Sequence, residues 1–286
     1  MIPLKDNIPS YKKPIINYSI IAINTFVFIY QYFLLPSKEE IQQFVYDYGF
    51  IPYRFLTEPF SSWYTIFTSM FLHGSFLHFF GNMWFLYIFG DNVEDRFGHI
   101  KFLLIYLLCG VSATFVQLIF SPTSTLPMIG ASGAISGVLG SYFIFFPTAG
   151  VLTLVLFGIF TRIVVFPAVI FLGFWFIFQL LSGTQTFALQ IVSGREIGGV
   201  AYWAHIGGFI TGLVIAKFNK KKRRSVLVSK STEDFRGKVA KINHHFSSKN
   251  LYPSSSKSDL RFAASSFGTS IFGSFRILLM QPAFSA

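Results

Sequence analysis

Ser132 is the residue of this chain whose type and setting first suggest chemistry. It lies in Gly130-Ala131-Ser132-Gly133-Ala134, where a polar, glycine-flanked loop turns into an apolar run of helix length. His78 and His205 occupy comparable positions near the starts of two other apolar runs. A histidine can take the proton of a serine hydroxyl and later give it to a leaving group. These residue types indicate hydrolysis of a peptide bond inside a membrane.

The composition indicates a protein built of membrane helices. Of its 286 residues 52% are hydrophobic and 12% are charged, and the mean hydropathy is +0.56. A soluble domain carries about 25% charged residues. The net charge of +11 could suggest nucleic acid, but the basic residues gather at the N-terminus and after residue 216, as in the flanks of membrane helices. We therefore expect a lipid bilayer, and no nucleic acid, as a partner.

Six apolar runs are candidates for membrane spans, each of which takes about 20 residues. They predict an all-α, polytopic bundle of six transmembrane helices. Residues 1–14 would form a cytoplasmic N-terminus, residues 15–219 the six-span domain, and residues 220–286 a basic, Ser-rich cytoplasmic tail that we expect to be disordered. The six runs cover residues 15–35, 75–90, 99–120, 132–147, 163–182 and 200–217.

The stretches between the runs have other expected places. Residues 36–74 are too polar to span and too apolar to leave the membrane, so they are expected in its interface. Val151 to Phe160 is too short to span and is expected to be interfacial or re-entrant. Lysines and arginines before the first run and after the sixth would fall on one side of the membrane. Both termini are therefore expected in the cytoplasm.

Ser132, His205 and His78 are predicted to lie at one depth. A helix rises about 1.5 Å per residue, which puts them roughly 22, 18 and 20 Å above the cytoplasmic ends of their helices. Small residues in the fourth and sixth runs would let these two helices approach closely. Such an approach would bring Ser132 within reach of His205. The small residues are Gly133, Ser136, Gly137 and Gly140 in one run and Ala204, Gly208 and Gly212 in the other.

The remaining polar residues divide the roles further. No Asp or Glu lies in the outer half of any run, so a Ser132–His205 dyad without a carboxylate is expected. His78 and Asn82 are four residues apart on one helix face, and both can donate hydrogen bonds to an oxyanion. Two histidines could also bind a metal, but a third strong ligand at that depth is missing from the sequence. We expect no metal and no cofactor.

Four short motifs resemble the rhomboid family of intramembrane serine proteases. His78-Phe-Phe-Gly-Asn82 resembles the family's H-x-x-x-N, Gly130-Ala-Ser132-Gly133 its G-x-S-G, and Ala204-His205-Ile-Gly-Gly208 its A-H-x-x-G. Glu94-Asp95-Arg96-Phe97-Gly98 resembles its E-x-R-x-G. The resemblance covers about residues 1–219, in the right order, and is similar to the simple bacterial six-span form. The chain departs from some members at Ser136, where they carry a tyrosine that would stack on the histidine.

The resemblance implies a function and a role for each residue. Ser132 would be the nucleophile and His205 the general base and acid, and His78, Asn82 and the Ser132 backbone N–H would hold the oxyanion. Substrates would be single-span membrane proteins cut near the outer face. From the residues themselves, we expect access from the outer side to be gated by the glycine-containing loop 184–199 and by Phe171, Phe174, Trp175 and Phe178 of the fifth run. The membrane would be a bacterial plasma membrane. The sequence leaves the oligomeric state unknown.

Two alternatives belong to other functional classes. A non-catalytic, rhomboid-like scaffold that binds client transmembrane segments would be expected to lose Ser132 or His205, and both are present. A channel or transporter usually shows ionisable residues along a path through its spans. Here these residues form one layer near one face, which favours a site open to one side.

Overall fold

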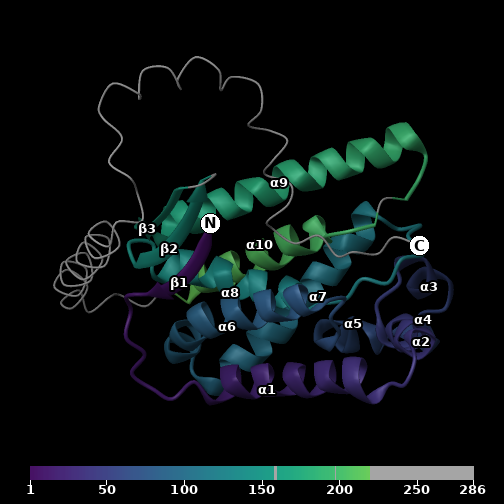
Figure 1. The fold of residues 1–286 in the computed structure, drawn as a ribbon, viewed down its shortest axis with the longest axis horizontal. Helices are drawn as coiled ribbons and strands as arrows, with labels where there is room; N and C mark the ends of the chain where they lie inside the picture. The colour runs from purple at the N-terminus through teal and green to yellow at the C-terminus, as the bar shows by residue number, and fades with distance from the viewer. Residues whose placement is uncertain (158–159, 197, 220–286) are drawn as a thin grey trace.

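Six longer helices build the part of the chain that the computed structural model describes, namely residues 1–157, 160–196 and 198–219 (Figure 1). The mostly helical class expected from the sequence is confirmed. The residues predicted to form a tail, 220–286, lie outside the described residues. The six helices are α1 (Ile15–Ile29), α6 (Phe76–Phe97), α7 (His99–Phe120), α8 (Ser132–Phe145), α9 (Ala168–Ser193) and α10 (Tyr202–Phe218).

Three helical stretches in the described residues are long and apolar enough to cross a membrane. They are Ile15–Leu34, which joins α1 to the π-helical turn η1 (Tyr30–Leu34), and the whole of α7 and α9. Helix α8 is apolar but has only 14 residues. A membrane protein is therefore supported by three spans, and the full number of six stays a prediction.

Helix α8 lies at the centre of the bundle, in contact with α6, α7, α9 and α10. Its closest neighbour is α10, because glycines face each other where the two helices cross. A Cβ on Gly208 would overlap the carbonyl oxygen of Gly133, and a Cβ on Gly212 would overlap that of Gly137. The backbones of the two helices therefore touch, as small residues at a membrane-helix interface allow.

Glu94, near the C-terminal end of α6, accepts hydrogen bonds from the N-terminal end of α1. Its carboxylate is 1% exposed and accepts hydrogen bonds from the backbone N–H groups of Ile16 (3.0 Å) and Asn17 (2.7 Å). It also lies 2.5 Å from Nδ1 of His99. The first N–H groups of a helix have no partner within it and carry partial positive charge, so a buried carboxylate is stabilised there.

A three-stranded antiparallel sheet covers one end of the bundle (Figure 1). It contains β1 (Ile2–Asp6), β2 (Gly150–Phe157) and β3 (Phe160–Pro167), in the order β1-β2-β3. Ile2 pairs with Leu154, and Gly150 pairs with Pro167. The sequence analysis was wrong to begin the fifth span at residue 163, because the apolar helix begins at Ala168. Residues 151–157 lie in strand β2, and the expected interfacial or re-entrant place of Val151 to Phe160 stays a prediction. The β-branched residues of 163–165 favour the extended backbone that they adopt.

Short helices fill residues 38–71 at the other end of the bundle (Figure 1). Their surfaces expose Leu56, Phe60 and Trp63. The expected place of this segment in the membrane interface stays a prediction. Phe50 bridges to Met128, so this segment is joined to the loop that leads into α8. The elements are α2 (Lys38–Tyr48), α3 (Pro52–Thr57), α4 (Pro59–Ser62), α5 (Thr65–Thr68) and the 3-10 turn η2 (Ser69–Phe71).

Helix α9 is longer than the sequence analysis predicted. It continues to Ser193 and ends at Gly194, whose φ is +62°, so most of the expected loop 184–199 is helical. Its aromatic residues also divide between two environments. Phe174 and Phe178 are exposed on the bundle surface, whereas Phe171 is buried in the core. The surface positions fit contact with lipid better than a cover over the site.

Candidate active site

Ser132 begins α8, directly after a loop with one unusual glycine. Gly130 has a φ of +123°, a conformation that L side chains rarely adopt, and its N–H donates to the carbonyl oxygen of Ser69 (2.8 Å). A Cβ at this position would lie 2.7 Å from ring atoms of His78. Gly130 is therefore required both by the turn of the chain and by the imidazole beside it, and it sets the direction in which Ser132 enters the helix.

His205 of α10 reaches Ser132 across the close contact between the two helices. Its Nε2 lies 2.8 Å from Oγ of Ser132, and the ring is buried, with 5% of the residue exposed. The Ser136 hydroxyl, one turn further along α8, donates instead to the backbone carbonyl of Ser132 (2.6 Å). The structure therefore brings together Ser132 and His205, two of the residues that the sequence analysis selected.

The second ring nitrogen of His205 faces α9. Nδ1 lies 2.8 Å from Oε1 of Gln179, which is itself 6% exposed. A carbonyl oxygen can only accept, so this contact puts the imidazole proton on Nδ1 and leaves the lone pair of Nε2 toward Ser132. Trp175, one turn earlier on α9, lies with its ring centroid 6.0 Å from that of His205. His205 thus has neighbours on both α8 and α9.

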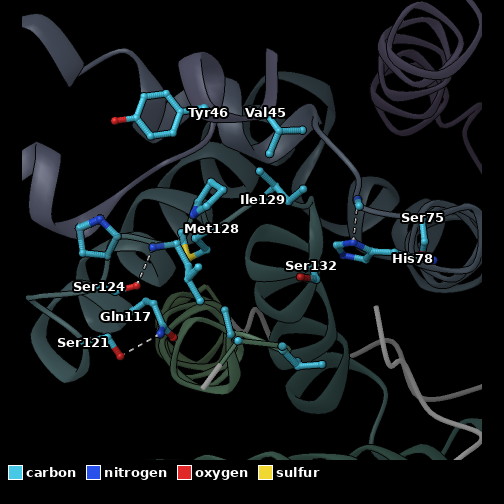
Figure 2. Close-up of a pocket in the computed structure, with 18 of the residues that line it drawn as sticks. Val45, Tyr46, Ser75, His78, Gln117, Ser121, Ser124, Met128, Ile129 and Ser132 are labelled. Carbon is cyan, nitrogen blue, oxygen red and sulfur yellow. Dashed lines mark hydrogen bonds between the residues drawn. The ribbon is translucent and has the colours of Figure 1, made fainter. Parts of the chain in front are cut away.

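His78 stands beside Ser132 on the same cavity wall, near the start of α6 (Figure 2). Ser75 caps this helix by accepting from the backbone N–H of His78 (3.1 Å). The His78 Nδ1 accepts from the N–H of Gly74 (3.4 Å), so its proton belongs on Nε2, the atom that lies against Gly130. The ring therefore presents a hydrogen-bond donor close to Ser132.

Asn82 lies one turn after His78 on α6 and is 3% exposed. Its Nδ2 is buried and has no hydrogen-bond partner among the described residues. Buried donors are almost always paired in folded proteins. The side chain does not belong to the cavity wall itself, so of the two predicted oxyanion donors only His78 lines the cavity.

The dyad opens onto a cavity of about 620 Å³ that is lined by Ser132, His78 and His205. Its far walls come from α2, from the loop before α8 and from the chain between α9 and α10 (Figure 2). Glu196 in that last segment accepts from the Ser124 hydroxyl and from the Thr125 N–H (3.3 Å) and hydroxyl (3.2 Å). These bonds link the chain after α9 to the loop between α7 and α8, and so cover part of the cavity. Among the described residues, no three His, Cys, Asp or Glu side chains gather as a metal site would require.

The sequence analysis missed Gln179, although the residue carries a recognisable mark. It is the polar residue of Phe176-Ile-Phe-Gln-Leu-Leu181, an otherwise apolar stretch within a predicted span. A polar side chain is costly in a bilayer unless it finds a hydrogen-bond partner, so it could have been flagged as a contact to another helix. Its partner could not be named, because His205 lies 26 residues away on a different helix.

The fold and the site define a polytopic helical membrane protein with a Ser–His pair in a cavity. The Rhomboid domain, a family model, matches residues 61–221, which is more than half of the chain. The chain therefore belongs to the rhomboid family, and it is an integral membrane protein.

Individual relatives match over shorter parts. Rhomboid-like protein 11, chloroplastic, of Arabidopsis thaliana is 30% identical over 56% of this chain and 54% of its own length. RHOMBOID-like protein 6, mitochondrial, of the same plant is 27% identical over 64% and 50%. Rhomboid protease GluP of Bacillus subtilis is 39% identical over 28% and 15%. The match therefore spans about half the length of the first two relatives and a small part of the third.

Proposed function

We propose that this protein is an intramembrane serine endopeptidase that cuts single-span membrane proteins near the outer face of the bilayer. The observation that carries the proposal is the 2.8 Å contact between Ser132 Oγ and His205 Nε2, beside a cavity that a peptide could enter. Family membership supports it, because one relative is named a rhomboid protease.

The geometry supports a two-step mechanism. His205 takes the Ser132 proton while Oγ attacks the carbonyl carbon of the scissile bond, and the same proton then goes to the leaving amine. The resulting acyl-enzyme is hydrolysed by water, which His205 activates in the same way. The tetrahedral oxyanion of each step would accept hydrogen bonds from His78 Nε2–H, Asn82 Nδ2–H and the Ser132 backbone N–H.

The second candidate is a non-catalytic membrane scaffold that binds client transmembrane segments. It is kept because several rhomboid relatives are named without the word protease. The Ser132–His205 contact favours the protease, since a scaffold has no use for a histidine that accepts from a serine hydroxyl.

The membrane in which the protein acts is a separate question. A bacterial plasma membrane, as expected from the sequence, receives no support from relatives named chloroplastic and mitochondrial. Our proposal therefore concerns the bilayer and its outer face without assigning the organelle. The cytoplasmic location of both termini stays a prediction.

The test is cleavage of a panel of single-span membrane proteins by purified protein in liposomes. We expect wild-type protein to release defined fragments, and Ser132→Ala and His205→Ala to release none while both variants remain folded. Because the two residues act as a unit, the double variant should be no slower than either single variant. Fragments of equal yield from Ser132→Ala protein would refute the protease and leave the scaffold.

A further inference from the structure

Gln179 contacts His205 on the side of the ring that faces away from Ser132. Its Oε1 lies 2.8 Å from Nδ1, while the Ser132 hydroxyl lies 2.8 Å from Nε2. We propose that Gln179 is a positioning residue, which holds His205 in the tautomer and orientation that take the proton from Ser132. The inference rests on the proposed protease function and adds a third member, from α9, to a dyad carried by α8 and α10.

The acceptor matters because a neutral imidazole has one N–H and one lone pair. With the proton on Nε2, His205 could donate to the Ser132 hydroxyl but could not take its proton. The Gln179 oxygen favours the other tautomer, with the proton on Nδ1 and the lone pair directed at Ser132. It also opposes rotation of the ring, since rotation would leave a buried N–H without a partner.

Gln179 keeps this role after the proton has moved. The imidazolium then carries N–H groups on both nitrogens, one toward Gln179 and the other toward the leaving amine that receives the proton. The amide oxygen accepts from Nδ1–H in both states, and the negative end of its dipole stabilises the new positive charge. A neutral amide does this without the cost of burying a carboxylate, and the outer halves of the predicted spans contain no Asp or Glu.

The surroundings of Gln179 show how α9 presents it. Phe174 and Phe178 on the same helix are 64% and 38% exposed, so that face meets the lipid. Trp175 and Gln179, four residues apart, share a different face, about 100° further round the helix, and both contact His205. The orientation of His205 therefore depends on where α9 lies, and any displacement of α9 would withdraw the acceptor.

A purely structural role would be the mutual satisfaction of two buried polar groups. To separate the roles, Gln179→Leu and Gln179→Met remove the acceptor at similar size, and Gln179→Glu keeps an acceptor in either protonation state. Phe174→Leu, on the lipid face of α9, serves as the control. Each protein is assayed for kcat and KM with a cleaved substrate and for the rate of Ser132 labelling by a small fluorophosphonate, which needs no lateral passage of a helix.

We expect Gln179→Leu and Gln179→Met to lower kcat and the labelling rate by about 10- to 100-fold, which corresponds to losing a buried hydrogen-bond partner. KM should stay near the wild-type value, and the thermal midpoint should fall only by the few degrees that one unpaired buried donor costs. Gln179→Glu should recover most of the labelling rate, and Phe174→Leu should match the wild type.

Two results would overturn the inference while the protease stands. One is a folded Leu or Met variant that labels as fast as the wild type. The other is a folded Glu variant no faster than the Leu variant, which would mean that an acceptor at this place is not what matters. If neither the Leu nor the Met variant folds, a folded Glu variant that labels about 10-fold or more slowly than the wild type overturns the inference, because it keeps the acceptor. Wild-type protein that neither cleaves nor labels would instead refute the proposed function and this inference with it.

Discussion

The amide of Asn82 holds a buried donor that no described residue satisfies. The ring of His78 presents a second N–H beside Ser132, on the cavity wall. Leaving a buried donor unpaired costs about 1–3 kcal/mol. Such a cost is tolerated where a ligand or a transition state supplies the missing acceptor. At the scale of single residues, the N–H groups of Asn82 and His78 are therefore candidates to bind a developing oxyanion.

Removing either donor should slow catalysis without ending it. We expect His78→Ala and Asn82→Ala each to lower kcat by about 10²- to 10³-fold, the loss typical of one oxyanion donor, because the Ser132 N–H remains. The measurement is single-turnover cleavage by purified protein, with Phe80→Leu, an exposed residue of the same helix, as control. Wild-type turnover in both alanine variants would contradict the assignment of these donors.

The residues of the site differ in how far the sequence reveals them. Ser132 and His205 could be selected because each is a polar residue in an apolar run. The depth of each can be estimated by counting residues from the cytoplasmic end of its helix. Their separation of 2.8 Å depends on two helices packed through glycines, and the pattern of small residues predicted that approach. Gln179 was not selected from the sequence because its role depends on the rotation of α9 about its own axis. The spacing of apolar residues in a lipid-facing helix does not fix that rotation.

At the scale of elements, the contact between α8 and α10 controls the distance between the two halves of the dyad. Ser132 and His205 each lie near the start of their helix, and the glycines follow them at one-turn intervals. A side chain at Gly140, Gly208 or Gly212 would meet backbone atoms of the facing helix, which cannot rotate away. The helices would have to separate, and reacting atoms need a separation of about 3–3.5 Å.

Enlarging Gly208 and Gly212 should therefore lower the proposed protease activity. We expect Gly208→Ala and Gly212→Ala to destabilise the fold by about 1–3 kcal/mol, as overpacking does, and to lower kcat. Gly173→Ala on α9 is the matched control, because a Cβ there meets nothing within 4 Å. Thermal unfolding and cleavage assays on the three proteins check both effects. Normal kcat in both α10 variants would show that this contact does not control the distance between Ser132 and His205.

The sheet is the part of the fold that local sequence patterns did not predict. Strand β2 pairs with β1, whose residues lie about half the chain earlier, and with β3, which the sequence analysis had joined to a membrane helix. A short apolar run of this length is consistent with a buried strand or with a piece of helix, and only its pairing partner decides. That partner lies in the polar N-terminal segment, which by itself shows no strand pattern.

At the scale of the whole molecule, the sheet and the candidate site are attached to opposite ends of α8. Ser132 begins this helix, and Tyr142, ten residues on and so about 15 Å away along the axis, bonds to strand β1. The Tyr142 hydroxyl donates to Asp6 (2.5 Å), and the Asn92 amide of α6 donates to the same carboxyl group (2.9 Å). Asp6 therefore ties the N-terminal strand to two helices of the bundle, far from the dyad.

Asp6 should make the stability of the protein depend on pH. Burial raises the pKa of its carboxyl group from 3.8 to about 7, the Tyr142 hydrogen bond opposes this shift, and the nearby Asp91 adds to it. Between these two pH values the folded chain holds a proton that the unfolded chain has released. The stabilisation is thus complete at low pH and is lost as pH rises toward 7, by about 1.4 kcal/mol per pH unit.

The thermal midpoint of the wild type should accordingly fall by several degrees between pH 5.5 and pH 8.5. Asp6→Asn carries no titrating proton, so its midpoint should fall less over the same interval, and the difference between the two proteins removes the contribution of all other groups. Labelling of Ser132 at pH 7.5 should be equal in both, because the dyad lies at the other end of α8. Parallel midpoint curves for the two proteins would show that Asp6 titrates alike in the folded and unfolded chains, and that its burial against α6 and α8 does not shift its proton affinity.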